Sequence, residues 1–186
     1  MSKVVIIGGN KRAGKTTLSM MLRNEHNFNY FSFDSILDAL ESALPSLGDG
    51  NDSKYIPFLD ELIEKALEDG KNYGYSTVFD YVFSPEQILK LKHLNDVEVV
   101  FLANLDANQE NIRGDLKKYS VSYDWPTTAT DEDIERNSNG ILAYNELLVR
   151  DCQKYGFRLV NTSRAENRIP ILTELANSLS SNSLRL

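Results

Sequence analysis

The sequence predicts an α/β fold with three layers, in which a five-stranded parallel sheet lies between two layers of helices. Short runs of β-branched and aromatic residues alternate with longer amphipathic segments along the chain, a pattern typical of parallel sheets. The first run, Val4-Val5-Ile6-Ile7, is continuously apolar, as expected for a strand buried on both faces. Because crossover connections are right-handed, helices should then cover both faces of the sheet.

The first half of the chain contains two strands and three helices. Apolar residues at helical spacing predict a helix over 15–24, directly after the first strand. The alternating aromatic segment 28–33 predicts a second strand that stops at Asp34. A helix should follow and end at Pro45, since proline cannot continue a helix. A further amphipathic helix is predicted over 57–69.

The second half contains three further strands. The runs of β-branched and aromatic residues that predict them are 75–79, 97–102 and 157–160. Ser84 followed by Pro85 is typical of a helix start, and Thr130 with Asp133 forms a capping box at the start of a helix over 130–155. A last helix is predicted over 169–179. Weak periodicity in 106–130 predicts no regular element there.

The composition fits one ordinary globular domain. A chain of 186 residues can bury one core but is short for two, so a single domain over 1–186 is expected. The net charge of −7 argues against general binding to nucleic acid or to an anionic membrane. Cys152 is the sole cysteine, and the first apolar run is too short for a signal peptide or a membrane span. We therefore expect a cytoplasmic monomer or homodimer.

An octapeptide after the first strand matches the pattern G-x-x-x-x-G-K-[ST], known as the P-loop, in full. Its residues are Gly9, Asn10, Lys11, Arg12, Ala13, Gly14, Lys15 and Thr16. Glycine lets successive N–H groups, as far as Thr17, point at phosphate oxygens. Lys15 is expected at the β- and γ-phosphates and the Thr16 hydroxyl on Mg²⁺, whereas Lys11 and Arg12 either add positive charge or face solvent. The octapeptide thus predicts a site for ATP and Mg²⁺; the alternative is a glycine turn beside a surface lysine.

Two aspartates follow predicted strands at the edge of the sheet where this loop lies. Asp34 comes after the second strand and Asp80 after the third. Because the ends of parallel strands collect at the ligand-binding edge, both carboxylates should face the phosphates. For each aspartate the alternative is a structural role; for Asp34 that role would be the N-cap of the following helix.

At these residues the chain resembles the nucleoside-monophosphate-kinase-like group of P-loop kinases, which includes adenylate, shikimate and gluconate kinases. The motifs that carry the resemblance are the P-loop helix, Phe33-Asp34, Val78-Phe79-Asp80, Tyr155-Gly156-Phe157 and Val160-Asn161-Thr162-Ser163. The resemblance implies that Asp34 contacts the acceptor and orients or deprotonates it. It also implies that Asp80 lies near magnesium through water or contacts substrate, and that the loop with Ser163 packs beside the adenine ring.

The group also has a mobile lid between the fourth strand and the long helix, with arginines that close on the phosphates. By resemblance the lid would cover approximately 104–130, and Arg113 and Arg136 are the candidate arginines. The chain departs from the strong pattern, because no Arg-x-x-x-Arg pair occurs in this region, and both arginines could instead be solvated helix charges.

The sequence thus predicts an ATP-dependent phosphotransferase that moves the γ-phosphate to a hydroxyl, or a phosphate, of a small molecule. The sequence lacks the Asn-Lys-x-Asp motif that a guanine-specific GTPase would ordinarily contain. No arginine occurs between residues 35 and 75, which favours a neutral or weakly charged alcohol over a nucleoside monophosphate as acceptor. The alternative is a nucleotide-dependent ATPase or switch protein that has no small-molecule acceptor.

Overall fold

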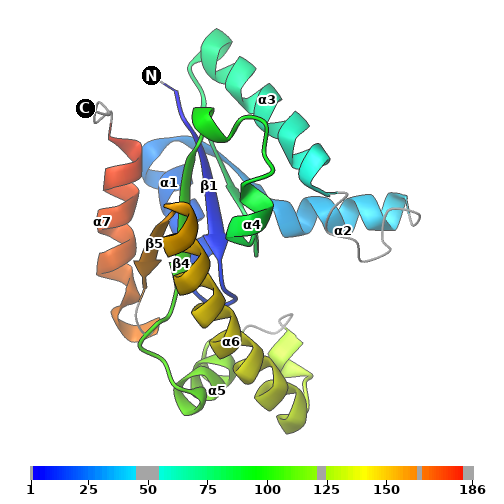
Figure 1. Ribbon diagram of the computed structural model, residues 1–186, viewed down its shortest axis with the longest axis vertical. Coiled ribbons are helices and arrows are strands. Elements are labelled where there is room, and N and C mark those ends of the chain that lie inside the picture. Colours follow the sequence, from blue (N-terminus) through cyan, green and yellow to red (C-terminus); the bar gives the residue numbers. More distant parts are fainter. Residues whose placement is uncertain (1, 45–54, 121–124, 163–164, 182–186) are drawn as a thin grey trace.

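A five-stranded, wholly parallel sheet forms the centre of the protein, as the sequence predicts (Figure 1). The computed structural model describes residues 2–44, 55–120, 125–162 and 165–181. The strands are β1 (Val4–Gly9), β2 (Phe28–Ser32), β3 (Ser76–Asp80), β4 (Glu98–Ala103) and β5 (Arg158–Asn161). Their order is β2-β3-β1-β4-β5, so the connection after β1 runs to the β2 edge of the sheet and the later connections run back toward β5. The connections that leave the adjacent strands β1 and β3 therefore diverge. Ligands of open parallel sheets bind at such a point, beyond the carboxyl ends of the strands.

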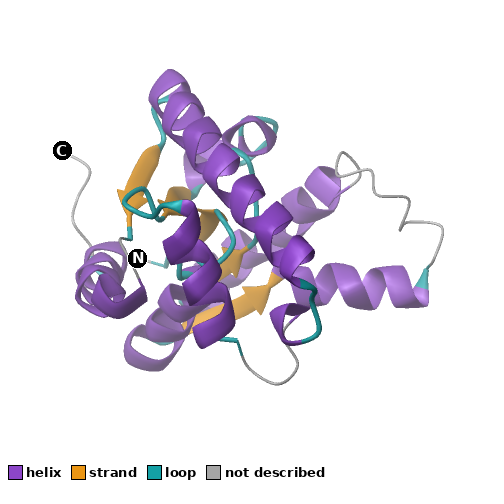
Figure 2. Ribbon diagram, turned by 90° about the horizontal axis from the view of Figure 1, so that it is seen from below, coloured by secondary structure: helices purple, strands orange, loops and turns teal. Residues whose placement is uncertain are grey.

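Helices cover both faces of the sheet, which completes the predicted three layers (Figure 2). The helices are α1 (Lys15–His26), α2 (Phe33–Ala43), α3 (Tyr55–Tyr73), α4 (Pro85–Ile88), α5 (Gln109–Lys118), α6 (Asp131–Tyr155) and α7 (Arg168–Ser180), with short 3₁₀ turns η3 (Leu94–Asp96), η4 (Trp125–Thr127) and η5 (Ala165–Asn167). One face packs on α1 and α7, and the other on α2, α3 and α6. Among the described residues, no helix has the length and apolar character that crossing a bilayer requires.

Strand β1 holds the two layers together, because its side chains alternate between them. Val5 and Ile7 pack against α1 and α7, whereas Val4 and Ile6 pack on the opposite face. Burying each such side chain contributes roughly 1.5–3 kcal/mol. On that opposite face α6 contributes Cys152, which is 2% exposed. The P-loop therefore starts from the most deeply buried strand of the sheet.

Two predicted helix boundaries differ from the structure for local reasons. Helix α2 begins at Phe33, inside the predicted second strand, because the Ser32 hydroxyl accepts a hydrogen bond from the Ser35 N–H at 3.4 Å and caps the helix. Helix α3 runs past its predicted end and through Gly70. A Cβ on Gly70 would lie 2.6 Å from the Ser2 hydroxyl, so this glycine serves close packing and does not end the helix.

Helix α5 forms in the segment for which the sequence predicts no regular element. Ile112 and Leu116, one turn apart, bury against α6, and the Asn108 side chain caps the helix by accepting from the Asn111 N–H at 2.9 Å. Two apolar residues give little periodicity, but they suffice when a neighbouring helix covers them. The predicted caps at Ser84 and Thr130 are both present as capping boxes.

Candidate active site

The P-loop leaves β1 through a backbone that requires glycine. Gly9 has a φ of 118°, and a Cβ there would lie 2.1 Å from the carbonyl oxygen of Leu102 on β4. Gly14, with a φ of 92°, is the N-cap residue of α1. Its carbonyl accepts the first helical bond, from Leu18, so the N–H groups of residues 15–17 precede the helical ladder and are available to an anion.

We predict that Gly9→Ala abolishes nucleotide binding and lowers the melting temperature far more than Gly156→Ala. Gly156, the C-cap of α6, also has a positive φ, 74°, but its added Cβ would meet nothing within 4 Å. The control should therefore show only the conformational penalty, about 1 kcal/mol. Thermal unfolding of both variants, with ADP titration, checks this. Equal losses in the two variants would contradict a steric cause at Gly9.

Two N–H groups that were expected to face phosphate donate hydrogen bonds within the loop itself. The Lys11 N–H donates to the Asn10 side-chain oxygen at 2.8 Å, and the Ala13 N–H donates to the Asn10 carbonyl at 3.4 Å. These two bonds hold the first part of the loop, whereas the N–H groups of residues 15–17 lie before the helical ladder of α1.

The Lys15 ammonium group lies among opposing charges. It donates to the Asn10 carbonyl at 2.8 Å. Burial lowers the pKa of Lys15 from 10.5 to about 8; the negative charges of Asp80 and Asp34 oppose this shift and Lys11 adds to it. A bound phosphate would restore the charged form of this amine, because it places negative charge beside it.

We therefore predict that ADP affinity falls roughly tenfold between pH 7 and pH 9, because free Lys15 loses its proton through its pKa of about 8. Bound phosphate favours the protonated amine, so binding should take up protons near pH 8. Calorimetry in two buffers of different ionisation enthalpy measures that uptake. The Lys15→Met variant should bind weakly and without this pH dependence. A flat profile in the unmodified protein would contradict the assignment.

Asp80 lies at the end of β3, beside the first turns of α1. Its carboxylate is 2% exposed and accepts from the Ser19 hydroxyl at 3.3 Å, from the Tyr30 hydroxyl at 3.3 Å and from Thr16. Burial raises the pKa of Asp80, and the charge of Lys15 opposes the shift. The structure thus brings together Thr16 and Asp80, the two residues predicted at magnesium.

These two residues fit a magnesium ion shared with phosphates. A hydroxyl and a carboxylate are hard oxygen donors, and Mg²⁺ in nucleotide sites commonly takes one or two protein ligands and completes its shell with phosphate and water. Within the described ranges, no group of three or more His, Cys, Asp or Glu side chains is placed to hold a metal. Thr16 and Asp80 would therefore supply the protein oxygens at such an ion, directly or through water.

Asp34 lies in the first turn of α2, and its charge also acts on Lys15. Its proposed structural alternative, the N-cap, is wrong, because Ser32 occupies that position. The Asp34 side chain is exposed, and its pKa is raised by partial desolvation, with Lys15 as the largest opposing charge. A carboxylate that is close to the P-loop lysine and open to solvent can contact a second substrate.

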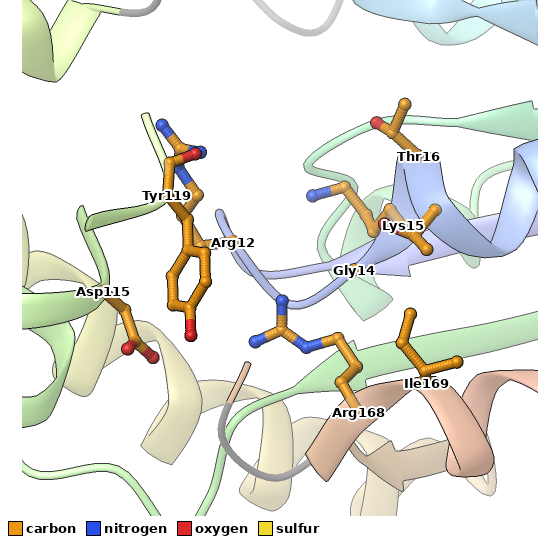
Figure 3. Close-up of a pocket in the computed structure, with 9 residues that line it drawn as sticks. Arg12, Gly14, Lys15, Thr16, Asp115, Tyr119, Arg168 and Ile169 are labelled. Carbon is orange, nitrogen blue, oxygen red and sulfur yellow. The ribbon is translucent and has the colours of Figure 1, made fainter. Parts of the chain in front are cut away.

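A cavity of about 450 Å³ opens along the P-loop, between α1, α5 and α7 (Figure 3). Its lining residues are Arg12, Gly14, Lys15, Thr16, Thr17, Asp115, Tyr119, Arg168 and Ile169. Lys15 and Arg168 both extend toward the side of the cavity where Tyr119 and Arg12 lie (Figure 3). The volume is in the usual range for small-molecule sites.

Arg168, the first residue of α7, is a site residue that the sequence does not reveal. Its side chain lies against the P-loop, since a Cβ on Gly14 would be 2.6 Å from its Cδ. Its buried Nε has no hydrogen-bond partner among the described residues. Burial lowers the pKa of Arg168, and nearby Arg12 adds to that shift. No motif marks this position, so its donors are recognised only once the fold places them over the loop.

The remaining predicted residues are distributed around this cavity. Arg12 donates to the Tyr119 carbonyl and to the Ser120 hydroxyl, both at 3.3 Å, so it ties the P-loop to the end of α5. Arg136 on α6 pairs with Asp133 and lines a second hollow, of about 310 Å³, with Asn10 and Lys11. The remaining residues of this hollow are Val82, Asn137, Gly140, Ile141 and Tyr144.

The structure gives no support for the predicted roles of Arg113 and Ser163. Arg113 lies half-buried on α5 and is not among the residues that line either hollow. Ser163 lies outside the described residues. The roles of Arg113 and Ser163 therefore remain predictions. Of the two proposed lid arginines, Arg136 is the one that shares a hollow with P-loop residues.

Comparisons with known proteins agree with the predicted fold. No protein-family model matches the sequence, and a search of curated proteins finds no match. Among solved structures, shikimate kinase from Bacteroides thetaiotaomicron is 14% identical, with a TM-score of 0.54 over 96% of this chain and 99% of the other. A gluconokinase from Sinorhizobium meliloti is 11% identical, with a TM-score of 0.55 over 95% of both chains.

A third similar structure, from Chloroflexus aurantiacus, is a protein whose kinase assignment is itself provisional. It is 17% identical, with a TM-score of 0.56 over 96% of both chains. At these identities the similarity establishes the fold alone, which in this chain is a five-stranded parallel sheet between helices.

Proposed function

We propose that this protein is an ATP-dependent small-molecule kinase that transfers the γ-phosphate to a hydroxyl group. The observation that carries the proposal is that two carboxylates, Asp80 and Asp34, are both close enough to Lys15 to act on its charge. A protein that only binds nucleotide needs the P-loop lysine and a metal carboxylate. The second, exposed carboxylate at Asp34 adds the group that an acceptor hydroxyl requires.

In the proposed reaction the acceptor oxygen bonds to the γ-phosphorus while the bond to the β–γ bridging oxygen breaks, and ADP leaves. Asp34 orients the hydroxyl and takes its proton. Lys15 and the N–H groups of residues 15–17 hold the phosphates and stabilise the negative charge in the transition state. Magnesium, held through Thr16 and Asp80, supplies charge neutralisation on the phosphate oxygens when bound.

The two hollows beside the P-loop support separate places for the two substrates. The larger cavity lies along the start of α1, where the nucleotide would bind. The second hollow adjoins Asn10 and Lys11 on the α6 side and contains no carboxylate in its lining. Asp34 lines neither hollow, so we assign the second hollow to the body of the acceptor and expect the reacting hydroxyl to extend out of it toward Asp34. Lys11 lines this hollow and also acts on the charge of Asp34, which supports that path. Arg136, which lines this hollow, would contact the acceptor or the transferring phosphate when the segment 104–130 closes. The closure, and a contact of Arg113 with the phosphates, remain predictions.

The deciding experiment is a coupled assay for ADP release with Mg-ATP and a panel of sugars, nucleosides and nucleoside monophosphates. A kinase should release ADP faster with one class of acceptor, and mass spectrometry should find the phosphorylated product. Slow release that is indifferent to every acceptor would support the alternative, an ATPase or switch protein. The cytoplasmic location and the monomeric or homodimeric state stay predictions from the sequence.

A further inference from the structure

A chain of buried side-chain amides connects helix α6 to the P-loop. Asn10, which is 3% exposed, donates from its Nδ2 to the Ile141 carbonyl at 2.6 Å and to the Asn145 Oδ1 at 2.8 Å. Asn145, 6% exposed, donates in turn to the Asn104 carbonyl at 2.8 Å, just beyond β4. Ile141 and Asn145 are one helical turn apart, so α6 presents two acceptors to one side chain of the loop.

The orientation of each amide is fixed by its neighbours. Asn145 must turn its NH₂ toward the Asn104 carbonyl, so its oxygen faces Asn10. Asn10 must then turn its NH₂ toward α6, and its oxygen accepts from the Lys11 N–H at 2.8 Å. Reversing either amide would set two acceptors or two donors against each other, a costly arrangement in a buried site. The chain of bonds therefore has a single arrangement.

The loop end of this chain reaches the lysine that the nucleotide needs. The Asn10 backbone is held by its own N–H bond to the Leu102 carbonyl at 3.0 Å, and its carbonyl accepts from the Lys15 ammonium at 2.8 Å. The place of the Asn10 carbonyl thus sets the place of the Lys15 charge. From this geometry we infer that Asn145 is a positioning residue, which acts through Asn10 to hold the P-loop and the Lys15 ammonium in place for phosphate.

The same helix also lines the second hollow. Arg136, Gly140 and Ile141 of α6 line the hollow assigned to the acceptor, and Asn145 follows one turn after Ile141. A shift of α6 caused by an occupant of that hollow would be passed to the P-loop through Asn10. This part rests on the proposed function; the positioning role rests only on binding of phosphate by the P-loop.

A double-mutant cycle on ligand affinity tests the positioning role. Asn10→Ala, Asn145→Ala and the double variant are titrated with Mg-ADP and, separately, with inorganic tripolyphosphate, which has no base. Each single change should lower both affinities by about tenfold, the scale of one lost buried hydrogen bond and the group it leaves unpaired. The double variant should be no weaker than the weaker single variant, because both changes cut the same chain of bonds.

A second measurement separates positioning from a loss of general stability. Hydrogen exchange at the Lys11 amide should accelerate in Asn145→Ala, although the two residues share no bond. The matched control is Asp60→Ala, which removes another buried side chain, 4% exposed, that accepts from the Lys92 N–H at 2.9 Å. It should lower the melting temperature and leave both affinities unchanged.

The outcomes distinguish the separate claims. Unchanged affinities in Asn145→Ala, or fully additive losses in the double variant, would overturn the positioning role. An equal loss in Asp60→Ala would reduce it to a stability effect and would overturn it as well. If the unmodified protein binds neither Mg-ADP nor tripolyphosphate, the nucleotide site itself is wrong, and the proposed function fails with it.

Discussion

Replacing Lys15 with methionine should lower phosphoryl transfer about a thousandfold and raise the melting temperature by a few degrees. The loss follows from the surroundings of the ammonium group, which donates to the P-loop carbonyl of Asn10 and interacts with the charges of Asp80 and Asp34. The gain follows from burial, which makes the charged amine unfavourable in the folded protein that has no phosphate beside it. Activity and stability should therefore change in opposite directions at this one residue.

The dependence on pH fixes the sign of the stability change. The pKa of Lys15 falls from 10.5 in the unfolded chain to about 8 in the folded protein, so the folded state binds fewer protons between these values. The destabilisation by Lys15 is thus complete below pH 8 and disappears toward pH 10.5. The stabilisation by Lys15→Met should be largest near pH 7 and shrink above pH 8.

Thermal unfolding at pH 7 and pH 10 measures this difference, and Lys71→Met serves as the control. Lys71 is an exposed lysine in the last turn of α3, far along the chain from the P-loop, and its loss should affect neither transfer nor the pH dependence of stability. A lower melting temperature for Lys15→Met at pH 7 would show that the lysine is stabilised in the folded protein and would contradict the burial argument.

Replacing Asp34 with asparagine should lower transfer by about a thousandfold while ATP affinity stays within about twofold. The amide has nearly the same shape but cannot take the proton of an acceptor hydroxyl. Asp34 is not the cap of α2, because Ser32 is, so the change should leave the start of the helix intact. The expected kinetic pattern is a lower kcat with unchanged binding of nucleotide.

Asp38→Asn is the matched control for Asp34, since it lies one turn later on α2, is also exposed and contributes to the charge around Asp34. It should change transfer by less than about threefold. Calorimetric titration with ATP and a steady-state assay compare the two variants. Equal activity of Asp34→Asn and the unmodified protein would remove Asp34 from the mechanism and leave the ATPase alternative in its place.

The parts of the fold that sequence alone predicts are those that local chemistry determines. The runs around Val4 and Val99 are β-branched, so the strands were found to within a residue or two. Glycine at Gly9 and Gly14 is required by the backbone itself, which is why the P-loop pattern is specific. Side-chain caps such as Ser84 and Thr130 act within four residues, so the sequence predicts these helix starts equally well.

What the sequence does not reveal depends on contacts between distant segments. Helix α5 is stable because α6 covers its two buried residues, and its own periodicity is weak. Ser32 caps α2 only because β2 ends one residue early, where Ser32 pairs with Asp80 in the sheet. Arg168 and Asn145 reach the P-loop from segments more than a hundred residues away, and neither belongs to a motif.

The buried position of Cys152 makes this chain well suited to site-specific labelling. It is the sole cysteine, it lies in the core on α6, and burial raises the pKa of its thiol to about 11, so it should react little with maleimides. Cysteines introduced at exposed positions such as Ser35 and Glu110 would then be the reactive thiols. A pair of fluorophores attached there could report whether the segment 104–130 moves when nucleotide binds, with no need to alter the native sequence elsewhere.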